Sequence, residues 1–489
     1  MKLQKQLTWI TAFIENVLFS GVTYGWANLY PVLKDEQFFA EDYNFTTYKS
    51  TRNNSFVQSS YDQYETLTLV FIISVSVSMF SVLFIGLIFD KLGMWFVRAL
   101  LTNSAAAAMF LLASISHKTS FLLYLVFPVF ATCSFNIFIL NAQVANLFEK
   151  NRGSYTASLA GAFNSGSVVY LFISYIYYNY KIKFSTIIYF YACFLITLNF
   201  RTFLLVPKYP VPFALPETYF YGYYELLKQV TNRKINKNLQ MSSSDSFNPD
   251  NMKLRQTMKK AFFWIGILCA VSFAFISNFY ISILNIFLPW VIQSSELEDV
   301  KYYTNIMGII QASSFIFSFI NSILLDLLYK KILKKYNNES ALLMTSSVGF
   351  YTSLSVLLLL NIANLVRHAS VQIFAMLMHA ISRVWFAGAF QYYCSALYPS
   401  QHFGKLYGIS MIFCGTVNTI QYPITRYVTK NPENNFIVIN GFLVGFCIVG
   451  FIHPSYLLHR YFKKQKCILK KRRADQSLVI VNSINVNTT

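Results

Sequence analysis

The stretch GLIFDKLGMWFVR, residues 86–98, is a short polar interruption between two long apolar runs. It sets Asp90 and Lys91 between Gly86 and Gly93, and it ends at Arg98. An aspartate at the end of an apolar helix can bond to basic groups and helix ends of a neighbouring bundle, and glycine allows two helices to approach closely. The stretch therefore predicts a turn between two membrane-spanning helices that also contacts another part of the chain.

A second, degenerate copy of this stretch lies later in the chain. NSILLDLLYKK, residues 321–331, keeps Asp326 and Lys330 but lacks the glycines of the first copy. One copy alone is also what an aspartate and lysines at any membrane edge would look like. Two copies at matching places indicate a duplicated half, and they resemble the loop pattern Gly-x-x-x-Asp-Arg/Lys-x-Gly of the major facilitator superfamily.

The composition indicates a membrane protein. Of 489 residues, 55% are hydrophobic and only 12% are charged, whereas about 25% are charged in an ordinary soluble protein. The formal net charge of +20 would also suit a nucleic-acid-binding protein, so the placement of the charges decides between the two classes.

Twelve apolar runs approach or exceed the roughly 20 residues that a membrane-spanning helix needs. They cover residues 8–30, 64–89, 97–116, 121–147, 155–179, 184–206, 261–292, 303–329, 341–364, 369–395, 404–427 and 435–458. The first run could be mistaken for a signal peptide, but it is long, carries Glu15 and Asn16, and lacks a small-residue cleavage site. We interpret it as a span.

Lysines and arginines concentrate on one side of these spans. With the amino terminus in the cytoplasm, most of the 40 basic residues fall in cytoplasmic loops and tails, as is typical of multi-pass membrane proteins. This orientation predicts that both termini are cytoplasmic, and it excludes nucleic acid as a partner. The lipid bilayer is the expected partner instead, and the basic tail over residues 459–489 can contact anionic lipids.

The longest cytoplasmic segment divides the chain in the middle. Residues 207–260 are rich in Lys, Asn, Ser and Pro, which is typical of a linker, and six predicted spans lie on each side. The predicted architecture is an all-α membrane protein of the major facilitator fold, with six-helix halves over residues 1–206 and 261–458. An extracellular loop over residues 31–63 belongs to the first half, and we expect a monomer.

The outer loop carries glycosylation sequons at Asn44 and Asn53, on the side where sugar is added. We therefore expect a glycoprotein of the plasma membrane, with an endomembrane location as the alternative. Six of the seven cysteines fall in predicted spans and Cys467 falls in the tail, so no disulfide is expected. Zinc-ligand spacing, a nucleophile elbow and a phosphate loop are all missing from the sequence, so we expect neither an enzyme nor a cofactor.

A cytoplasmic turn, YPSQHFGKLYG at residues 398–408, joins the tenth and eleventh predicted spans. Pro399 ends one helix. Gly404 and Gly408 begin the next helix, where we expect close contact with a neighbour, and Lys405 is predicted at the cytoplasmic edge.

Longer stretches resemble solute carrier family 43 of the major facilitator superfamily. They are PSQHFGKLYG at 399–408 with IQYPI at 420–424, RTFLLVPKYPVPFALPETYFYG at 201–222, GAFNSGSVVYL at 161–171, HAISRVWFAGA at 379–389 and ENVLFSGVTYGWANLYPVLKDEQFF at 15–39. All but the last are most similar to the nucleobase-transporting branch. The last is similar to that branch and to the branch that carries large neutral amino acids. This chain departs from the nucleobase branch at Asn164, where that branch has an acidic residue.

The resemblance implies a facilitative uniporter that works by alternating access on a small-molecule substrate and needs no sodium gradient. Purine nucleobases are the substrates that we favour. Large neutral amino acids are the first alternative, and a proton-coupled symporter that uses Glu15 or His379 is the second.

Polar residues within the spans are the candidate substrate ligands, because a polar group in the bilayer is costly unless it faces a cavity. Arg383 is the most informative, since its planar donor fork suits a carboxylate or a nucleobase carbonyl. A structural ion pair is the alternative role for it. The other candidates supply stacking rings, amide edges and an imidazole: Tyr24, Asn141, Gln143, Asn164, Asn278, Tyr280 and His379.

Glu15 is the natural partner of Arg383 by charge, and we favour a structural ion pair for it. Arg201, near the cytoplasmic end of the sixth span, is expected to snorkel to the membrane edge. An acid that could hold the ammonium group of an amino acid near the membrane centre is not evident, and this favours nucleobases. Glu15 joins the residues predicted to act in structure and gating: Gly86, Asp90, Lys91, Gly93, Arg98, Asp326, Gly404, Lys405 and Gly408.

Overall fold

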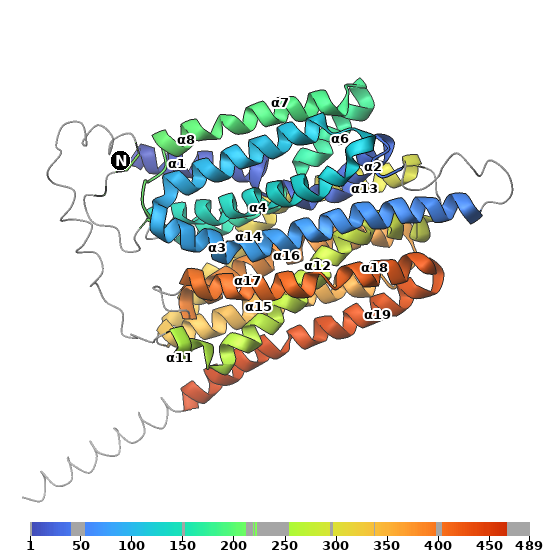
Figure 1. Ribbon diagram of the computed structural model, residues 1–489. Coiled ribbons are helices and arrows are strands. Elements are labelled where there is room, and N and C mark those ends of the chain that lie inside the picture. The colour runs from blue at the N-terminus through green and yellow to red at the C-terminus, as the bar shows by residue number, and fades with distance from the viewer. Residues whose placement is uncertain are drawn as a thin grey trace, which may run out of the picture.

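The computed structural model describes residues 2–40, 54–148, 152–211, 219, 221–222, 254–293, 297–336, 338–397 and 403–466, and all regular structure in these ranges is helical. Long helices lie side by side in one bundle (Figure 1). The sequons at Asn44 and Asn53, most of the 207–260 linker and most of the basic tail lie outside the described residues. The predictions made for them stay predictions.

The first part of the chain forms one side of the bundle. Its elements are α1 (Lys2–Glu15), η1 (Asn16–Ser20), η2 (Val22–Gly25), α2 (Trp26–Asp35), α3 (Asn54–Ser114), η3 (His117–Leu122), α4 (Leu123–Ala142), η4 (Gln143–Leu147), α5 (Arg152–Ser165), α6 (Val168–Tyr180), α7 (Phe184–Ile196) and α8 (Leu198–Leu204). The second and third predicted spans both lie in α3. The turn between them is a break at Gly93, whose φ of 78° and ψ of 178° favour glycine.

The second part of the chain forms the other side. Its elements are α11 (Leu254–Met258), α12 (Ala261–Ile292), α13 (Leu297–Ala312), α14 (Ser314–Leu333), α15 (Asn338–Ala363), α16 (Ala369–Leu397), α17 (Phe403–Asn418), α18 (Gln421–Lys430) and α19 (Pro432–Gly450), and residues 452–466 continue as helix. In the most apolar window of α12, 89% of the residues are buried, against 33% for α13 and α14 together. α12 is therefore an interior helix, whereas α13 and α14 present apolar side chains to the outside.

The two sides pack through matching helices. α3 lies along α17, and α5 lies along α14. In Figure 1 most of the blue-to-green first part lies above most of the yellow-to-red second part, and α13 lies beside α2 and α6. Each pair joins the second predicted span of one half to the fifth of the other, which is the arrangement expected when one six-helix unit is duplicated.

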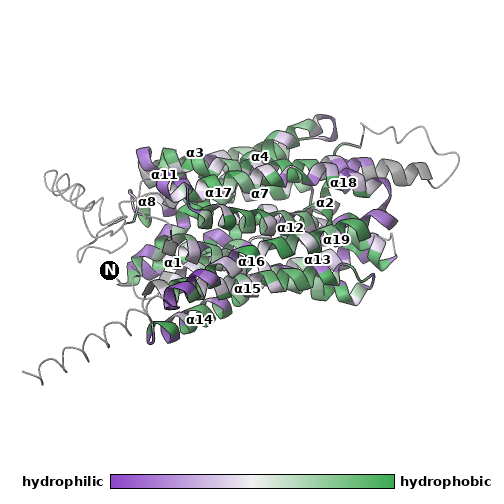
Figure 2. Ribbon diagram, turned by 90° about the horizontal axis from the view of Figure 1, so that it is seen from below, coloured by the Kyte–Doolittle hydropathy of each residue, from purple (hydrophilic) through white to green (hydrophobic). Residues whose placement is uncertain are grey.

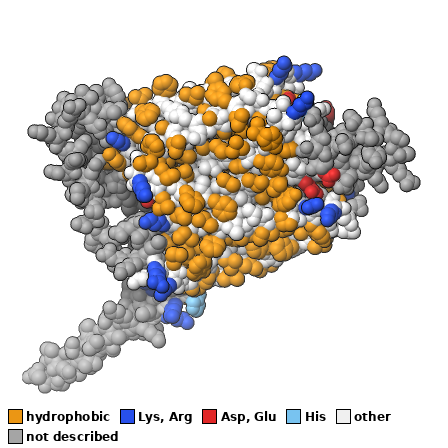
Figure 3. All heavy atoms as spheres, viewed as in Figure 1, with side chains coloured by type: hydrophobic (Ala, Val, Ile, Leu, Met, Phe, Trp, Pro, Cys, Tyr) orange, Lys and Arg blue, Asp and Glu red, His pale blue; other side chains and the backbone are white. Residues whose placement is uncertain are grey.

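The outside of the bundle is apolar along its middle and charged at its ends. Phe190 and Phe200 are 79% and 70% exposed, and many other large apolar side chains are exposed with them, as suits contact with lipid tails rather than water. Figure 2 shows the hydrophobic colour along the middle of the helices, and in Figure 3 the visible Lys and Arg side chains gather at the two ends. Nine helical stretches of the described chain are long and apolar enough to cross a membrane.

The predicted count of twelve spans stays a prediction. The helices explain why it differs from the nine stretches of the described chain that are long and apolar enough to cross a membrane. The stretch Asp62–Ser114 holds two predicted spans. The first and eleventh predicted spans do not form single helices. The first is divided among α1, η1, η2 and α2, and the eleventh is divided between α17 and α18.

The glycines that were expected to bring helices together differ in role. Gly86 and Gly404 have open space where a Cβ atom would be, so close contact at these two positions was a wrong prediction. At Gly408 the expected close contact is present, because a Cβ atom there would lie 2.9 Å from the Cα atom of Leu83 in α3. Lys405 is exposed next to this contact, in keeping with its predicted place at a membrane edge.

Candidate functional site

Arg383 of α16 meets Tyr24 of η2 in the interior of the bundle. The guanidinium Cζ atom lies 4.0 Å from the centroid of the tyrosine ring, a cation–π distance. This contact joins the two sides of the bundle. Arg383 is half-buried and has no hydrogen bond or ion pair with any residue that the structure describes, so its N–H donors are free to bind a ligand.

An irregular backbone presents Tyr24 at this point. Between α1 and α2 the chain forms a π-helical turn, η1, and then a 3₁₀ turn, η2. Gly21 between them packs so closely on α5 that a Cβ atom would lie 1.6 Å from the carbonyl oxygen of Phe163. A Cβ atom on Gly166, at the break between α5 and α6, would lie 2.8 Å from Gly21. Interrupted helices that meet inside the bundle are typical of transporter binding sites.

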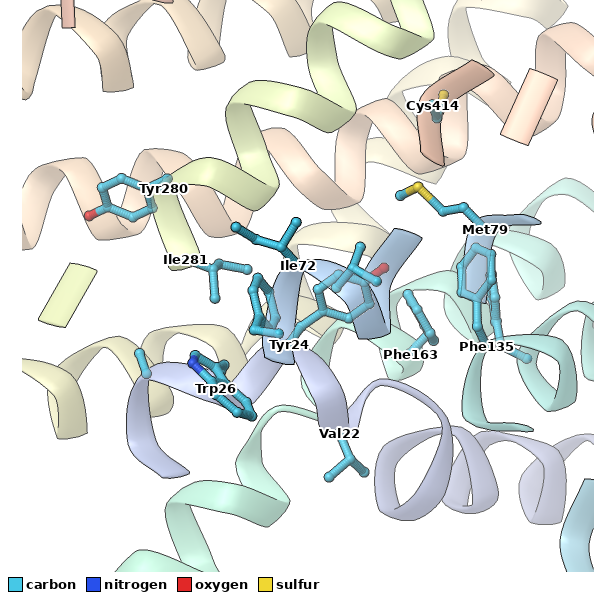
Figure 4. Packing of buried hydrophobic residues seen from close by; sticks show 14 of the residues in the cluster. Val22, Tyr24, Trp26, Ile72, Met79, Phe135, Phe163, Tyr280, Ile281 and Cys414 are labelled. Carbon is cyan, nitrogen blue, oxygen red and sulfur yellow. The ribbon is translucent and has the colours of Figure 1, made fainter. Parts of the chain in front are cut away.

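Tyr24 begins a row of aromatic rings. Its ring meets Phe163 edge-on, with centroids 5.6 Å apart, and Phe163 stacks on Phe138 at 4.3 Å. Figure 4 shows Tyr24 and Phe163 together with Met79 of α3, and with Cys414 of α17 from the other side of the bundle. This row of aromatic rings suits a flat ligand ring, because aromatic rings favour offset stacking and edge contacts.

His379 and Tyr280, two further predicted ligands, lie near Arg383. His379 is one helical turn before it on α16, and its Nε2 atom is 3.1 Å from the carbonyl oxygen of Ser277 in α12. Because a carbonyl only accepts, Nε2 carries the proton and Nδ1 is left as an acceptor. Nδ1 and the hydroxyl of Tyr280 have no hydrogen-bond partner in the described chain, and the Tyr280 ring centroid is 4.9 Å from that of the imidazole.

Asn278 was predicted as a ligand, but its amide is engaged in a network between the two sides. Its Nδ2 donates to Asn418 Oδ1 at 3.1 Å, and Asn418 Nδ2 donates to Ser76 Oγ at 3.0 Å. Gln421 donates to the same Asn418 oxygen at 2.8 Å. These buried amides link α3 and α12 to the break between α17 and α18, so they join helices, and of the Gln421 amide only Oε1 has no hydrogen-bond partner in the described chain.

Glu15 does not meet Arg383, its natural partner by charge, and forms ion pairs with two other arginines. The carboxylate of Glu15 pairs with Arg98 of α3 at 2.5 Å and with Arg201 of α8. Asn141 Oδ1 accepts from both guanidinium groups, at 2.8 Å from Arg98 and 3.0 Å from Arg201. All four residues are fully or largely buried, so Arg201 does not snorkel as expected. A buried carboxylate shared by two arginines and fixed by an amide is costly to disrupt.

Two other predicted ligands also have partners within the protein. Gln143 of η4 accepts a 3.4 Å hydrogen bond from the backbone N–H of Val211, in the segment after α8. Asn164 of α5 donates to the carbonyl of Ala160 in its own helix at 2.9 Å. Further along the chain after α8, the hydroxyl of Tyr221 lies 3.2 Å from that of Thr8 in α1. Burial raises the pKa of Tyr221.

The two predicted contact aspartates differ. Asp326 accepts a 3.0 Å hydrogen bond from Ser154 in the first turn of α5, where the helix dipole favours a negative charge. Asp90 is exposed, with no hydrogen bond or ion pair to the described residues. The second copy of the motif therefore joins the two sides, and the first copy does not do so among the described residues.

At the opposite end of the bundle, polar contacts also join the two sides. Asn28 of α2 donates to the Thr304 carbonyl of α13 at 2.9 Å, Tyr64 of α3 donates to the Ser282 carbonyl of α12, and Thr429 of α18 donates to the Glu65 carboxylate of α3. Hydrogen bonds therefore also join the two sides of the bundle at this end.

A family model described as the Major Facilitator Superfamily matches residues 132–421. This range covers more than half of the chain and extends across both sides of the bundle, from α4 to α18. The chain belongs to the major facilitator superfamily. It is a multi-pass membrane transporter, and the predicted superfamily is confirmed.

Curated relatives within this superfamily extend over nearly the whole chain. Equilibrative nucleobase transporter 1 of Bos taurus is 24% identical over 486 residues, which cover 94% of this chain and 96% of the relative. Large neutral amino acids transporter small subunit 3 is 23% identical in both Mus musculus and Homo sapiens, over 93% and 92% of this chain and of the respective relatives. The resemblance to solute carrier family 43 is therefore confirmed along almost the full length of this transporter.

Sequence analysis missed the role of Arg98, which it placed in a loop motif. The signal was present in MWFVRALL, residues 94–101, where Arg98 has apolar neighbours on both sides. A base deep in an apolar run needs a partner, and Glu15 and Arg201 lie in equally apolar surroundings. Three such charges in the same half indicate a network, although the sequence alone does not say which of the bases the acid meets.

Proposed function

We propose that this transporter is a facilitative uniporter of purine nucleobases that works by alternating access. The observation that carries the proposal is the free guanidinium of Arg383 over the ring of Tyr24, between the two sides of the bundle. A purine offers a flat face for the aromatic row and carbonyl or ring-nitrogen acceptors for the guanidinium. The likeness to an equilibrative nucleobase transporter supports the same substrate class.

Large neutral amino acids are the second candidate, because relatives named for them match at similar length and Arg383 can also bind a carboxylate. An amino acid would bring an ammonium group, and no described carboxylate contacts this site to receive it. Coupling to protons has less support, since the carboxylate of Glu15 is held by two arginines.

The proposal includes a movement of the two halves, residues 1–206 and 261–458, about the site. Twelve spans, cytoplasmic termini, a plasma-membrane location and a monomeric state belong to the same proposal. In that orientation the contact of Asp326 with Ser154 is on the cytoplasmic side, and the bonds of Asn28, Tyr64 and Glu65 close the extracellular side.

Uptake of radiolabelled adenine and leucine by cells that express the full chain tests the proposal. We expect saturable adenine uptake that equilibrates and that persists when the proton gradient is collapsed. Leucine uptake without adenine uptake would overturn the substrate, and loss of accumulation on collapse of the gradient would overturn uniport. Arg383→Ala should abolish uptake while the protein still reaches the cell surface, and normal uptake by that variant would remove Arg383 from the mechanism.

A further inference from the structure

Among the described residues, the positive charge of Arg383 has no counter-charge. Three acids of the bundle have other partners: Glu15 pairs with two arginines, Glu65 bonds Thr429 at one end of the bundle, and Asp326 bonds Ser154 at the other. In the described chain, no carboxylate forms an ion pair with Arg383. This sets Arg383 apart from Arg98 and Arg201, which share the carboxylate of Glu15.

The side chains that face Arg383 are aromatic or weakly polar. Tyr24 of η2 lies beneath it, and His379 precedes it by one turn on α16. Tyr280 of α12 packs on that imidazole, and Cys414 of α17 belongs to the same buried cluster as Tyr24. None of these four groups is an acid, so none of them neutralises the guanidinium near neutral pH.

An unneutralised guanidinium in such surroundings selects among ligands. Arginine keeps its proton in proteins, and a buried charge is stabilised by a partner that is itself charged and hydrogen-bonded. A ligand edge with negative charge gains most, a neutral carbonyl gains less, and a ligand cation is repelled.

We propose that this site selects its ligand by charge. This inference rests on the proposed function. Arg383 binds purines best through an edge that is rich in oxygen or deprotonated. Acidic oxo-purines such as xanthine are therefore bound more tightly than the amino-purine adenine. The same arrangement binds ligand ammonium groups poorly. The ring of Tyr24 serves both kinds of purine, and Arg383 alone distinguishes them.

The test uses the purified full chain in liposomes with the same pH on both sides. KM values for radiolabelled xanthine and adenine are measured from mildly acidic to mildly alkaline pH, a range in which xanthine loses a ring proton and adenine stays neutral. We expect the KM of total xanthine to fall as pH rises and that of adenine to stay constant. A KM for xanthine that does not change with pH would overturn the inference.

Two substitutions assign the effect to Arg383. Arg383→Gln removes the charge but keeps an amide, and should raise the KM of xanthine about tenfold more than that of adenine, the size of one charge-assisted hydrogen bond. Arg383→Lys keeps the charge without the planar fork and should retain the pH dependence. An equal rise in KM for both purines in Arg383→Gln would contradict the inference.

Arg367→Gln is the matched control. Arg367 also lies over an aromatic ring, with Cζ 4.8 Å from the Trp290 centroid, but it is exposed and donates to the Trp290 carbonyl at 2.9 Å. Its substitution should leave both KM values unchanged. Melting curves of all variants in detergent separate a loss of binding from a loss of folding, because a folded Arg383→Gln protein must still show the selective loss.

Failure of the proposed function would be visible separately. If neither purine is carried and leucine is, the substrate proposal fails, and the charge inference is judged on leucine against its deaminated keto acid, 4-methyl-2-oxopentanoate. The keto acid has the carboxylate without the ammonium group, so it should inhibit leucine transport more strongly than unlabelled leucine does. Weaker inhibition by the keto acid would overturn the inference as well.

Discussion

Glu15 and Arg383 carry opposite charges in the same apolar interior, yet each has its own surroundings. Glu15 lies where α1 ends and meets two guanidinium groups, both of which also donate to the amide oxygen of Asn141. Arg383 lies across the interface from Tyr24 and meets a ring. A charge that is satisfied by protein groups stabilises the fold, whereas a charge left over is available to a ligand.

Glu15→Gln tests the stabilising role of the network. The variant keeps the shape of the side chain but leaves Arg98 and Arg201 together without a carboxylate. We expect the free energy of unfolding to fall by about 3–5 kcal/mol, the usual cost of removing one partner from a buried ion pair, and the melting temperature in detergent to fall with it.

Two further variants serve as controls for this prediction. Glu15→Gln with Arg98→Gln should recover part of the loss, because one unneutralised cation is removed. Glu65→Gln, at a partly exposed pair with Arg426, should change the melting temperature little. A Glu15→Gln protein that melts like the parent would show that the network does not stabilise the fold.

At the scale of helices, the interruptions carry the site. The first predicted span changes from α to π to 3₁₀ helix within a few residues, and α5 and α6 are separated opposite this change. Glycine meets glycine there, so the backbones are in direct contact and fix where Tyr24 points. The same interruption begins at the ion network of Glu15 and ends near Arg383.

Gly21→Ala should disrupt this contact. The added methyl group would lie 1.6 Å from the carbonyl oxygen of Phe163. The neighbouring atoms belong to backbone, so moving them to relieve the clash would cost much free energy. We expect loss of uptake together with poor surface expression, measured by labelling of intact cells. Gly86→Ala is the control, because open space surrounds that position and alanine favours helix; equal behaviour of the two variants would refute the explanation.

Features that depend on neighbouring residues could be predicted from the sequence, and features that depend on contacts with distant residues could not. Span positions follow from apolar run length, which is local, and so does the presence of Arg383 in the tenth span. The break at Gly21 could not be predicted, because it depends on a carbonyl oxygen of α5. The partner of Glu15 could not be predicted for a similar reason: Arg98, Arg201 and Arg383 all have the right charge, and only the packing of α1 with α3 and α8 decides among them.

On the scale of the whole molecule, the two sides are held together at both ends of one interface. Ser154 bonds Asp326 at one end, and Thr429 bonds Glu65 at the other. If the halves tilt during transport, the contact between α3 and α18 must open in each cycle, because it lies across the interface at the closed end.

A covalent link across that contact should therefore stop transport. In Glu65→Cys with Thr429→Cys, a short thiol-specific crosslinker that contains a disulfide should abolish uptake, and a reducing agent should restore it. Each single-cysteine variant treated in the same way controls for the six described native thiols and should keep its uptake. Full uptake by the crosslinked double variant would mean that this end does not open.

The unneutralised guanidinium of Arg383 has an electrical consequence. A charge displaced through the full membrane potential exchanges about 2.3 kcal/mol per 100 mV, so any shift of Arg383 relative to the membrane field makes the return of the empty carrier sensitive to voltage. An anionic passenger would cancel that charge and make the loaded step electrically silent. The membrane potential would then change the rate at which the empty transporter returns, and it would not change the rate of the step that carries the anionic substrate.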